Sequence, residues 1–117
     1  MSELSAMKCI PCRGGDPTVT EAQQVEYLKQ VPNWKVIKVN GIQHLERIFW
    51  FNDFSQALAF TNQVGEIAES QDHHPALLTE WGRVTVTWWT HIIKGLHNND
   101  FVSAAKVDKL ADPENLQ

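Results

Sequence analysis

Two runs of β-branched and aromatic residues flank the dipeptide Asn40-Gly41, and this arrangement constrains the fold more than any other feature of the sequence. The runs cover residues 34–39 and 42–51. Asn and Gly both tolerate the positive φ angles that a type I′ turn requires, so the pattern predicts an antiparallel β-hairpin.

A second pair of strands follows later in the chain, at 76–80 and 83–91, with a tight turn at Trp81-Gly82 between them. Alternation along the second of these strands separates an apolar face from a more polar one. The apolar face consists of Val84, Val86 and Trp88.

Three amphipathic helices are predicted from apolar residues that recur at helical spacing. The first, about 20–30, starts at Thr20, which forms a capping box with the glutamine three positions later. The second and longest spans roughly 54–70 and ends just before a pair of histidines. The last helix takes Asn98 or Asn99 as its N-cap.

The elements therefore follow the order α-β-β-α-β-β-α, and with 43% hydrophobic residues the 117-residue chain can build one core. We predict an α+β fold: a four-stranded antiparallel sheet with three helices on one face. Residues 18–112 are predicted to form this single domain. Residues 1–17 are expected to be a flexible leader, because their Pro-Cys-Arg-Gly-Gly-Asp-Pro stretch is turn-forming, and 113–117 a C-terminal tail.

Composition narrows the classes of partner. The net charge of −4 argues against binding of nucleic acid through its phosphates. No run approaches the roughly 20 apolar residues of a membrane span, and the N-terminus lacks the pattern of a signal peptide. We therefore expect a cytoplasmic protein that binds neither nucleic acid nor membrane.

The two cysteines, Cys9 and Cys12, form a C-x-x-C pair in the leader. This spacing suits half a zinc site or a redox dithiol, but no second C-x-x-C and no nearby H-x-x-x-H completes a zinc site. We interpret the pair as thiols in a mobile segment. Coordination of an adventitious metal, or bridging to another chain, stays open.

Three of the five histidines occupy places where a sheet can bring distant side chains together. His73 and His74 follow the longest helix, and His91 lies at the end of a strand. His44, inside a strand, and His97, in a loop, are interpreted as structural or solvated residues.

Glu69 precedes His73 by four residues, which on a helix would also suit a metal site. However, His73 and His74 are adjacent, and on an extended segment neighbouring side chains point apart, so a typical zinc spacing is lacking. We expect no metal at the site, and a metal hydrolase is the weaker alternative.

The histidines also stand at fixed spacings from several other residues. The pattern runs through Glu69, Asp72-His73-His74-Pro75, Trp81, Thr90-His91, Gly95-Leu96 and Asp100-Phe101, then Ala104-Ala105-Lys106. It resembles the signature of the pterin-4a-carbinolamine dehydratase family, and the resemblance covers residues 18–111. That family has three helices on one face of a four-stranded antiparallel sheet.

The resemblance implies an activity. The family removes water from a 4a-hydroxytetrahydropterin, which aromatic amino acid hydroxylases release, to give the quinonoid dihydropterin. One proton must reach the departing hydroxyl and one must leave N5, so neither a metal nor another cofactor is required. By the resemblance, His74 protonates the hydroxyl, while His73 and His91 act as bases.

The other signature residues would bind substrate or support the histidines. Asp72 or Glu69 can orient an imidazole, and Asp100 can hold the loop that carries the pocket. Pro75 orients the histidine pair. The remaining supporting residues are Thr90 and Trp81, which either packs in the core or walls the flat pterin.

One departure from the family pattern concerns Asn99, which stands where many animal relatives carry an arginine. Contacts with the substrate's side chain are therefore expected to differ here.

The resemblance also suggests partners. It implies a homodimer or homotetramer and a functional link to an aromatic amino acid hydroxylase. The alternative to an enzyme is a non-catalytic interaction or regulatory protein with a dehydratase-like fold. Such a role would not require the three histidines, and all are present.

Overall fold

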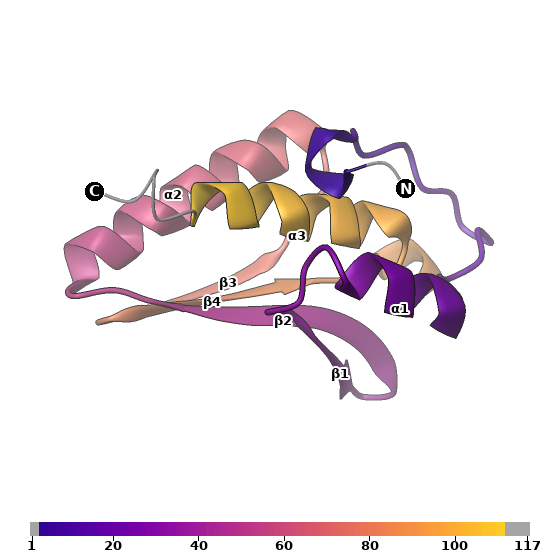
Figure 1. The fold of residues 1–117 in the computed structure, drawn as a ribbon, viewed down its shortest axis with the longest axis horizontal. Coiled ribbons are helices and arrows are strands. Elements are labelled where there is room, and N and C mark those ends of the chain that lie inside the picture. Colours follow the sequence, from indigo (N-terminus) through magenta and orange to yellow (C-terminus); the bar gives the residue numbers. More distant parts are fainter. Residues whose placement is uncertain (1–2, 112–117) are drawn as a thin grey trace.

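The computed structural model describes residues 3–111, and it confirms the predicted α+β fold and order of elements. Four strands form one antiparallel sheet in the order β1-β2-β4-β3, and the three α-helices lie over one face of it (Figure 1). The strands are β1 (Lys35–Val39), β2 (Ile42–Trp50), β3 (Ala76–Glu80) and β4 (Arg83–Trp88). The helices are α1 (Glu21–Leu28), α2 (Phe54–Gln71) and α3 (Asn98–Leu110), with short 3-10 turns η1 (Leu4–Ala6) and η2 (His91–Ile93).

The predicted hairpin is present between β1 and β2. Asn40 and Gly41 have φ angles of 53° and 80°, as a type I′ turn requires, and they bring Val39 opposite Ile42. β2 continues beyond β1 and pairs with β4 from Leu45 to Trp50. The central strands are therefore the two that come from different hairpins, which ties the two halves of the chain together.

The core lies between the sheet and the helices. On β4 the predicted apolar face is fully buried, and on α2 the buried residues recur at helical spacing. A polar contact joins α3 to the first hairpin, because Asp108 accepts hydrogen bonds from Trp34 Nε1 at 2.7 Å and from Arg47 Nη1 at 2.6 Å. The buried residues of β4 and α2 are Val84, Val86, Trp88, Ala57, Phe60, Val64 and Ala68.

Capping interactions define where α1 and α2 begin. Thr20 Oγ1 accepts from the amide of Gln23 at 3.1 Å, and the Gln23 side chain accepts from the amide of Thr20 at 2.8 Å, which is the predicted capping box. Asp53 caps α2 by accepting from the amide of Gln56 at 2.8 Å.

The N-cap of α3 differs from the prediction. It is His97, whose Nδ1 accepts from the amide of Asn99 at 3.1 Å, while Asp100 accepts from the amide of His97 at 2.9 Å. Asn98 and Asn99 lie inside the first turn. A buried carboxylate three residues after the cap selects His97, because it captures that residue's amide.

The leader packs against the domain. The sequence predicts that residues 1–17 lie apart from the core, yet Leu4 is buried in it. The amide of Leu4 donates to Gln30 Oε1 at 2.8 Å, and Lys106 Nζ donates to the carbonyl of Ser5 at 3.0 Å. The leader's apolar residues, such as Leu4 and Met7, follow no helical or strand periodicity that would reveal their packing on the core. The predicted tail, 113–117, lies outside the described residues.

None of the helices within residues 3–111 combines the length and the apolar character needed to cross a membrane.

Phe60 and Leu58 test which face of α2 carries the stability, because they are 2% and 44% exposed. Phe60→Ala should lower the free energy of unfolding by about 3–5 kcal/mol, since it leaves a cavity in the core. Leu58→Ala should cost less than about 1 kcal/mol. Urea unfolding of both variants checks this, and equal losses would show that the two faces of α2 are wrongly assigned.

Candidate active site

A pocket of about 500 Å³ opens where the end of α2, the end of β4 and the start of α3 meet the leader. All three histidines predicted from the sequence line it. The pocket has a size typical of small-molecule sites. Its lining consists of residues 9–12, 71–74, 89–92 and Asn99.

The end of α2 turns the two neighbouring histidines in different directions. Asp72 caps the helix in the left-handed conformation, with φ of 51°, and Pro75 leads into β3. The side chain of His73 is 13% exposed and points toward α3, whereas that of His74 is 54% exposed. One imidazole is therefore fixed by protein contacts, and the other is half exposed at the pocket edge.

Asp100 is the fully buried carboxylate that holds His73. Its Oδ1 lies 2.6 Å from His73 Nε2, and its Oδ2 accepts from Thr90 Oγ1 and from the amide of His97, both at 2.9 Å. A carboxylate only accepts hydrogen bonds, so His73 carries a proton on Nε2. A neutral ring then keeps a lone pair on Nδ1, which suits a general base.

Aromatic contacts position the histidine rings further. His73 stacks on the buried Trp88, with ring centroids 5.4 Å apart and planes inclined by 12°. His91, the first residue of η2, packs against Trp89 with centroids 4.5 Å apart. Each of these two imidazoles therefore rests on an indole at the end of β4.

His44 supports this arrangement through its contact with Trp89, a role that the sequence did not reveal. Its ring stacks on Trp89 at 4.0 Å with planes inclined by 15°, and it is buried. Burial lowers the pKa of His44, and the nearby charge of His91 lowers this pKa further, while Glu46 opposes the shift. The sequence interpretation of His44 as structural agrees with its place outside the pocket lining.

The leader supplies one wall of the pocket, and this too went unforeseen. Asn99 donates from Nδ2 to the carbonyl of Ile10 at 2.6 Å and accepts at Oδ1 from the amide of Ile10 at 2.9 Å. The amide of Cys9 donates to Gln71 Oε1 at 2.9 Å. The side chain of Asn99 is thus bound to the leader backbone.

The remaining predicted residues are placed differently. Glu69 lies on the exposed side of α2, with Oε2 3.6 Å from His74 Nε2, so it can orient that ring. Asp72 lines the pocket and ends the helix. Trp81 is 73% exposed on the turn between β3 and β4, at the opposite end of β4 from the pocket. Within this chain, Trp81 therefore neither packs in the core nor walls the pocket.

The metal-ligating side chains do not gather around the three pocket histidines. Among residues 3–111, one group of three such side chains has its donor atoms close together, and it contains none of these histidines, although its Cys12 also lines the pocket.

The chain is similar to proteins of one known family. A family model described as pterin 4 alpha carbinolamine dehydratase matches residues 17–110, a range that includes His73, His74 and His91. A transcriptional coactivator/pterin dehydratase from Brucella melitensis is 36% identical, with a TM-score of 0.72, over 81% of this chain and 99% of that chain. A pterin dehydratase-like protein that is a RuBisCO assembly factor in the alpha-carboxysome is 23% identical, with a TM-score of 0.58, over 68% of this chain and 90% of that one. The second likeness concerns the fold alone.

Asn99 tests how the leader is held. Asn99→Ala removes both hydrogen bonds to Ile10, which together contribute roughly 1–3 kcal/mol, so the segment around Ile10 should open more often. Hydrogen exchange followed by mass spectrometry should show faster exchange there. Asn99→Asp, which keeps only the hydrogen-bond acceptor, should give an intermediate rate. Unchanged exchange in Asn99→Ala would show that Asn99 does not hold the leader.

His44 gives the stability a pH dependence. Because its pKa is lowered in the folded state, the unfolded state binds the proton first as pH falls. The contribution of neutral His44 to the stability is thus full above the imidazole pKa of the unfolded state, about 6.5, and is lost as the pH falls below it. Urea midpoints should fall between pH of about 7.5 and about 5.5, and fall less in His44→Gln. An equal fall in both proteins would assign the effect to other groups.

Proposed function

This chain belongs to the pterin 4 alpha carbinolamine dehydratase family, and we propose that it dehydrates a 4a-hydroxytetrahydropterin to the quinonoid dihydropterin and water. One observation supports this most strongly: His73, His74 and His91 line a single pocket although they come from two distant segments.

Histidine suits the chemistry of this reaction. A proton must be given to the departing 4a-hydroxyl and another taken from N5, with no change of oxidation state. An unperturbed imidazole pKa of about 6.5 makes both protonation states accessible near neutral pH. Each positioned acid or base can raise the rate roughly 10²–10⁴-fold.

The surroundings of the histidines favour different roles. His74, half exposed and near the Glu69 carboxylate, is the proposed acid that protonates the leaving hydroxyl. His73 is the proposed base, because Asp100 holds its proton on Nε2 and leaves Nδ1 to accept. His91, which also lines the pocket, is proposed as a second base. Asp100 acts through His73 as a positioning residue.

The pocket also fits a flat bicyclic substrate. Trp89 lines the pocket with an aromatic side chain, and the leader closes one side with Cys9 and Ile10. Asn99 is occupied by the Ile10 backbone, so the substrate's side chain would meet the leader in place of a cationic residue. The substrate side chain tolerated here should therefore differ from that of relatives with arginine at this position.

An association between copies of this chain is also proposed. The sheet face away from the helices carries Ile48 and Leu78, both paired with Thr85, and the neighbouring Trp50, all of them exposed. This apolar surface supports a homodimer or homotetramer. The link to an aromatic amino acid hydroxylase rests on the family's substrate, and the cytoplasmic location stays a prediction from the sequence.

A non-catalytic role is the alternative. The two similar structures include a protein described as a transcriptional coactivator and another as an assembly factor. Those roles belong to those proteins. The three histidines and the buried Asp100 of this chain favour an enzyme.

His74→Ala tests the proposed acid. In a chelator-treated assay with chemically generated 4a-hydroxytetrahydropterin, the wild-type chain should accelerate dehydration, and the variant should lose about 10²–10⁴-fold of that acceleration. His97→Asn is the matched control, since it replaces a histidine outside the pocket lining and asparagine is a good N-cap.

Full activity in His74→Ala, or a strict requirement for metal, would contradict the proposed mechanism. No acceleration by the wild-type chain would favour the non-catalytic alternative.

A further inference from the structure

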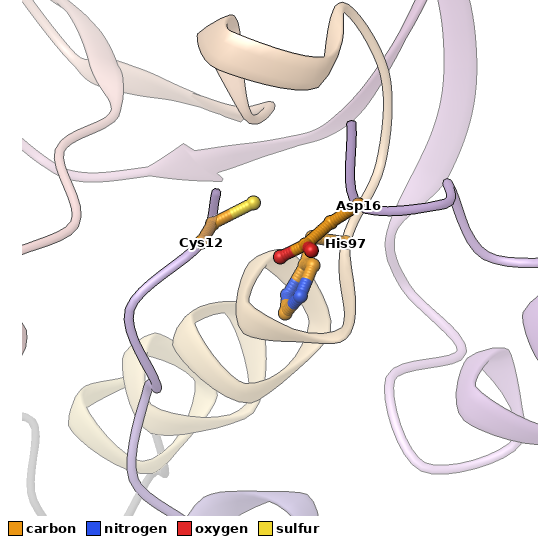
Figure 2. Close-up of side chains that lie close together, drawn as sticks. All are labelled: Cys12, Asp16 and His97. Atoms are coloured by element: carbon orange, nitrogen blue, oxygen red, sulfur yellow. The ribbon is translucent and has the colours of Figure 1, made fainter. Parts of the chain in front are cut away.

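Cys12, Asp16 and His97 bring three different metal-ligating side chains together at the edge of the domain (Figure 2). Their donor atoms all lie within 4.8 Å of one another, and all three residues are partly buried. Cys12 and Asp16 belong to the leader, and His97 caps α3. The sequence identified the cysteine pair but did not connect it with the other two residues.

A tight turn places the two leader residues. Gly15 has a φ of 95°, a conformation that glycine adopts without strain. The amide of Asp16 donates to the carbonyl of Arg13 at 3.0 Å, and the amide of Arg13 donates to Asp16 Oδ2 at 2.9 Å. These bonds hold the Asp16 carboxylate close to Cys12 and leave its Oδ1 without a role in the turn.

Cys9 does not take part in this group, although it forms the C-x-x-C pair with Cys12. Its Sγ lies 3.4 Å from Ser103 Oγ and 3.6 Å from the carbonyl of Asn99, so it faces α3. The two thiols therefore lie in different surroundings, Cys9 against α3 and Cys12 near Asp16 and His97.

We propose that Cys12, Asp16 and His97 bind one divalent transition metal ion, for which Zn²⁺ is the best match, and that this ion fastens the leader to the first turn of α3. Zinc takes sulfur, nitrogen and oxygen donors in tetrahedral sites, and three protein ligands leave a fourth position for water. The thiolate disfavours Mg²⁺ and Ca²⁺, which prefer oxygen ligands.

Binding of the ion competes with the cap of α3. A neutral imidazole has one lone pair, and Nδ1 of His97 now uses it to accept from the amide of Asn99. A ring that binds an ion through Nδ1 gives up this bond, and so does one that binds through Nε2, because its proton then sits on Nδ1. The helix start keeps its second cap, in which Asp100 accepts from the amide of His97. Loss of the hydrogen bond from the Asn99 amide to His97 is therefore a specific sign that the ion has bound.

The site is independent of the proposed catalytic reaction. Cys12 also lines the pocket, so the ion would brace the pocket wall from outside the histidine group. Metal binding is measured without reference to activity, and either proposal can fail alone.

The test uses the full chain, freed of metal by a chelator and reduced, with Co²⁺ as a spectroscopic probe and Zn²⁺ as its competitor. We expect one Co²⁺ per chain, a thiolate-to-metal charge-transfer band in the near ultraviolet, and loss of that band when Zn²⁺ is added.

Three variants remove one ligand each while keeping the local structure: Cys12→Ser, Asp16→Asn and His97→Asn. In Asp16→Asn the side-chain carbonyl oxygen can still accept from the amide of Arg13, and asparagine at 97 still caps the helix. Each variant should weaken binding by more than the roughly 10–100-fold that loss of a supporting partner costs. Cys9→Ser is the matched control and should bind as the wild type does.

NMR of the ¹⁵N-labelled chain should show the Asn99 amide shifting when Zn²⁺ is added. The proposal is overturned if the chain binds no Co²⁺ or Zn²⁺, if Cys9→Ser abolishes the charge-transfer band, or if His97→Asn binds as tightly as the wild type.

Discussion

The buried carboxylate of Asp100 is the contact on which the rest of the site depends. It accepts from Thr90 after β4 and from the amide of His97 at the start of α3, and it faces His73 after α2. The chain after α2, the chain after β4 and the start of α3 are thereby joined at one fully buried group. A buried charge of this kind is costly unless hydrogen bonds satisfy it. The Asp100 side chain therefore both joins these segments and orients His73.

The fold holds α3 in place so that this carboxylate reaches its partners. At the other end of the helix, Asp108 contacts Trp34 and Arg47 of the first hairpin region. Pairing of β2 with β4 then links that hairpin to the strand that leads to Thr90 and His91. The pocket wall, the orientation of His73 and the central strand pair are thus parts of one connected structure.

Features with a local cause were predictable from the sequence. The positive φ angles of Asn40 and Gly41, the capping box at Thr20 and the fixed spacing of the three histidines all appear as residue patterns. Contacts made only by tertiary packing were not predictable. The Asn99–Ile10 bonds and the His44–Trp89 stack each join residues that lie far apart in the sequence and share no periodic pattern.

The central claim is that Asp100 sets the tautomer of His73 for proton transfer, and Asp100→Asn tests it most directly. Asparagine still offers an oxygen to Thr90 and His97, but it can place an N–H against His73 Nε2, so the ring must carry its proton on Nδ1. ¹⁵N NMR of the His73 ring is measured together with kcat/KM for the dehydration. We expect a change of tautomer in a folded protein together with a loss of kcat/KM. Full kcat/KM with the changed tautomer would contradict it.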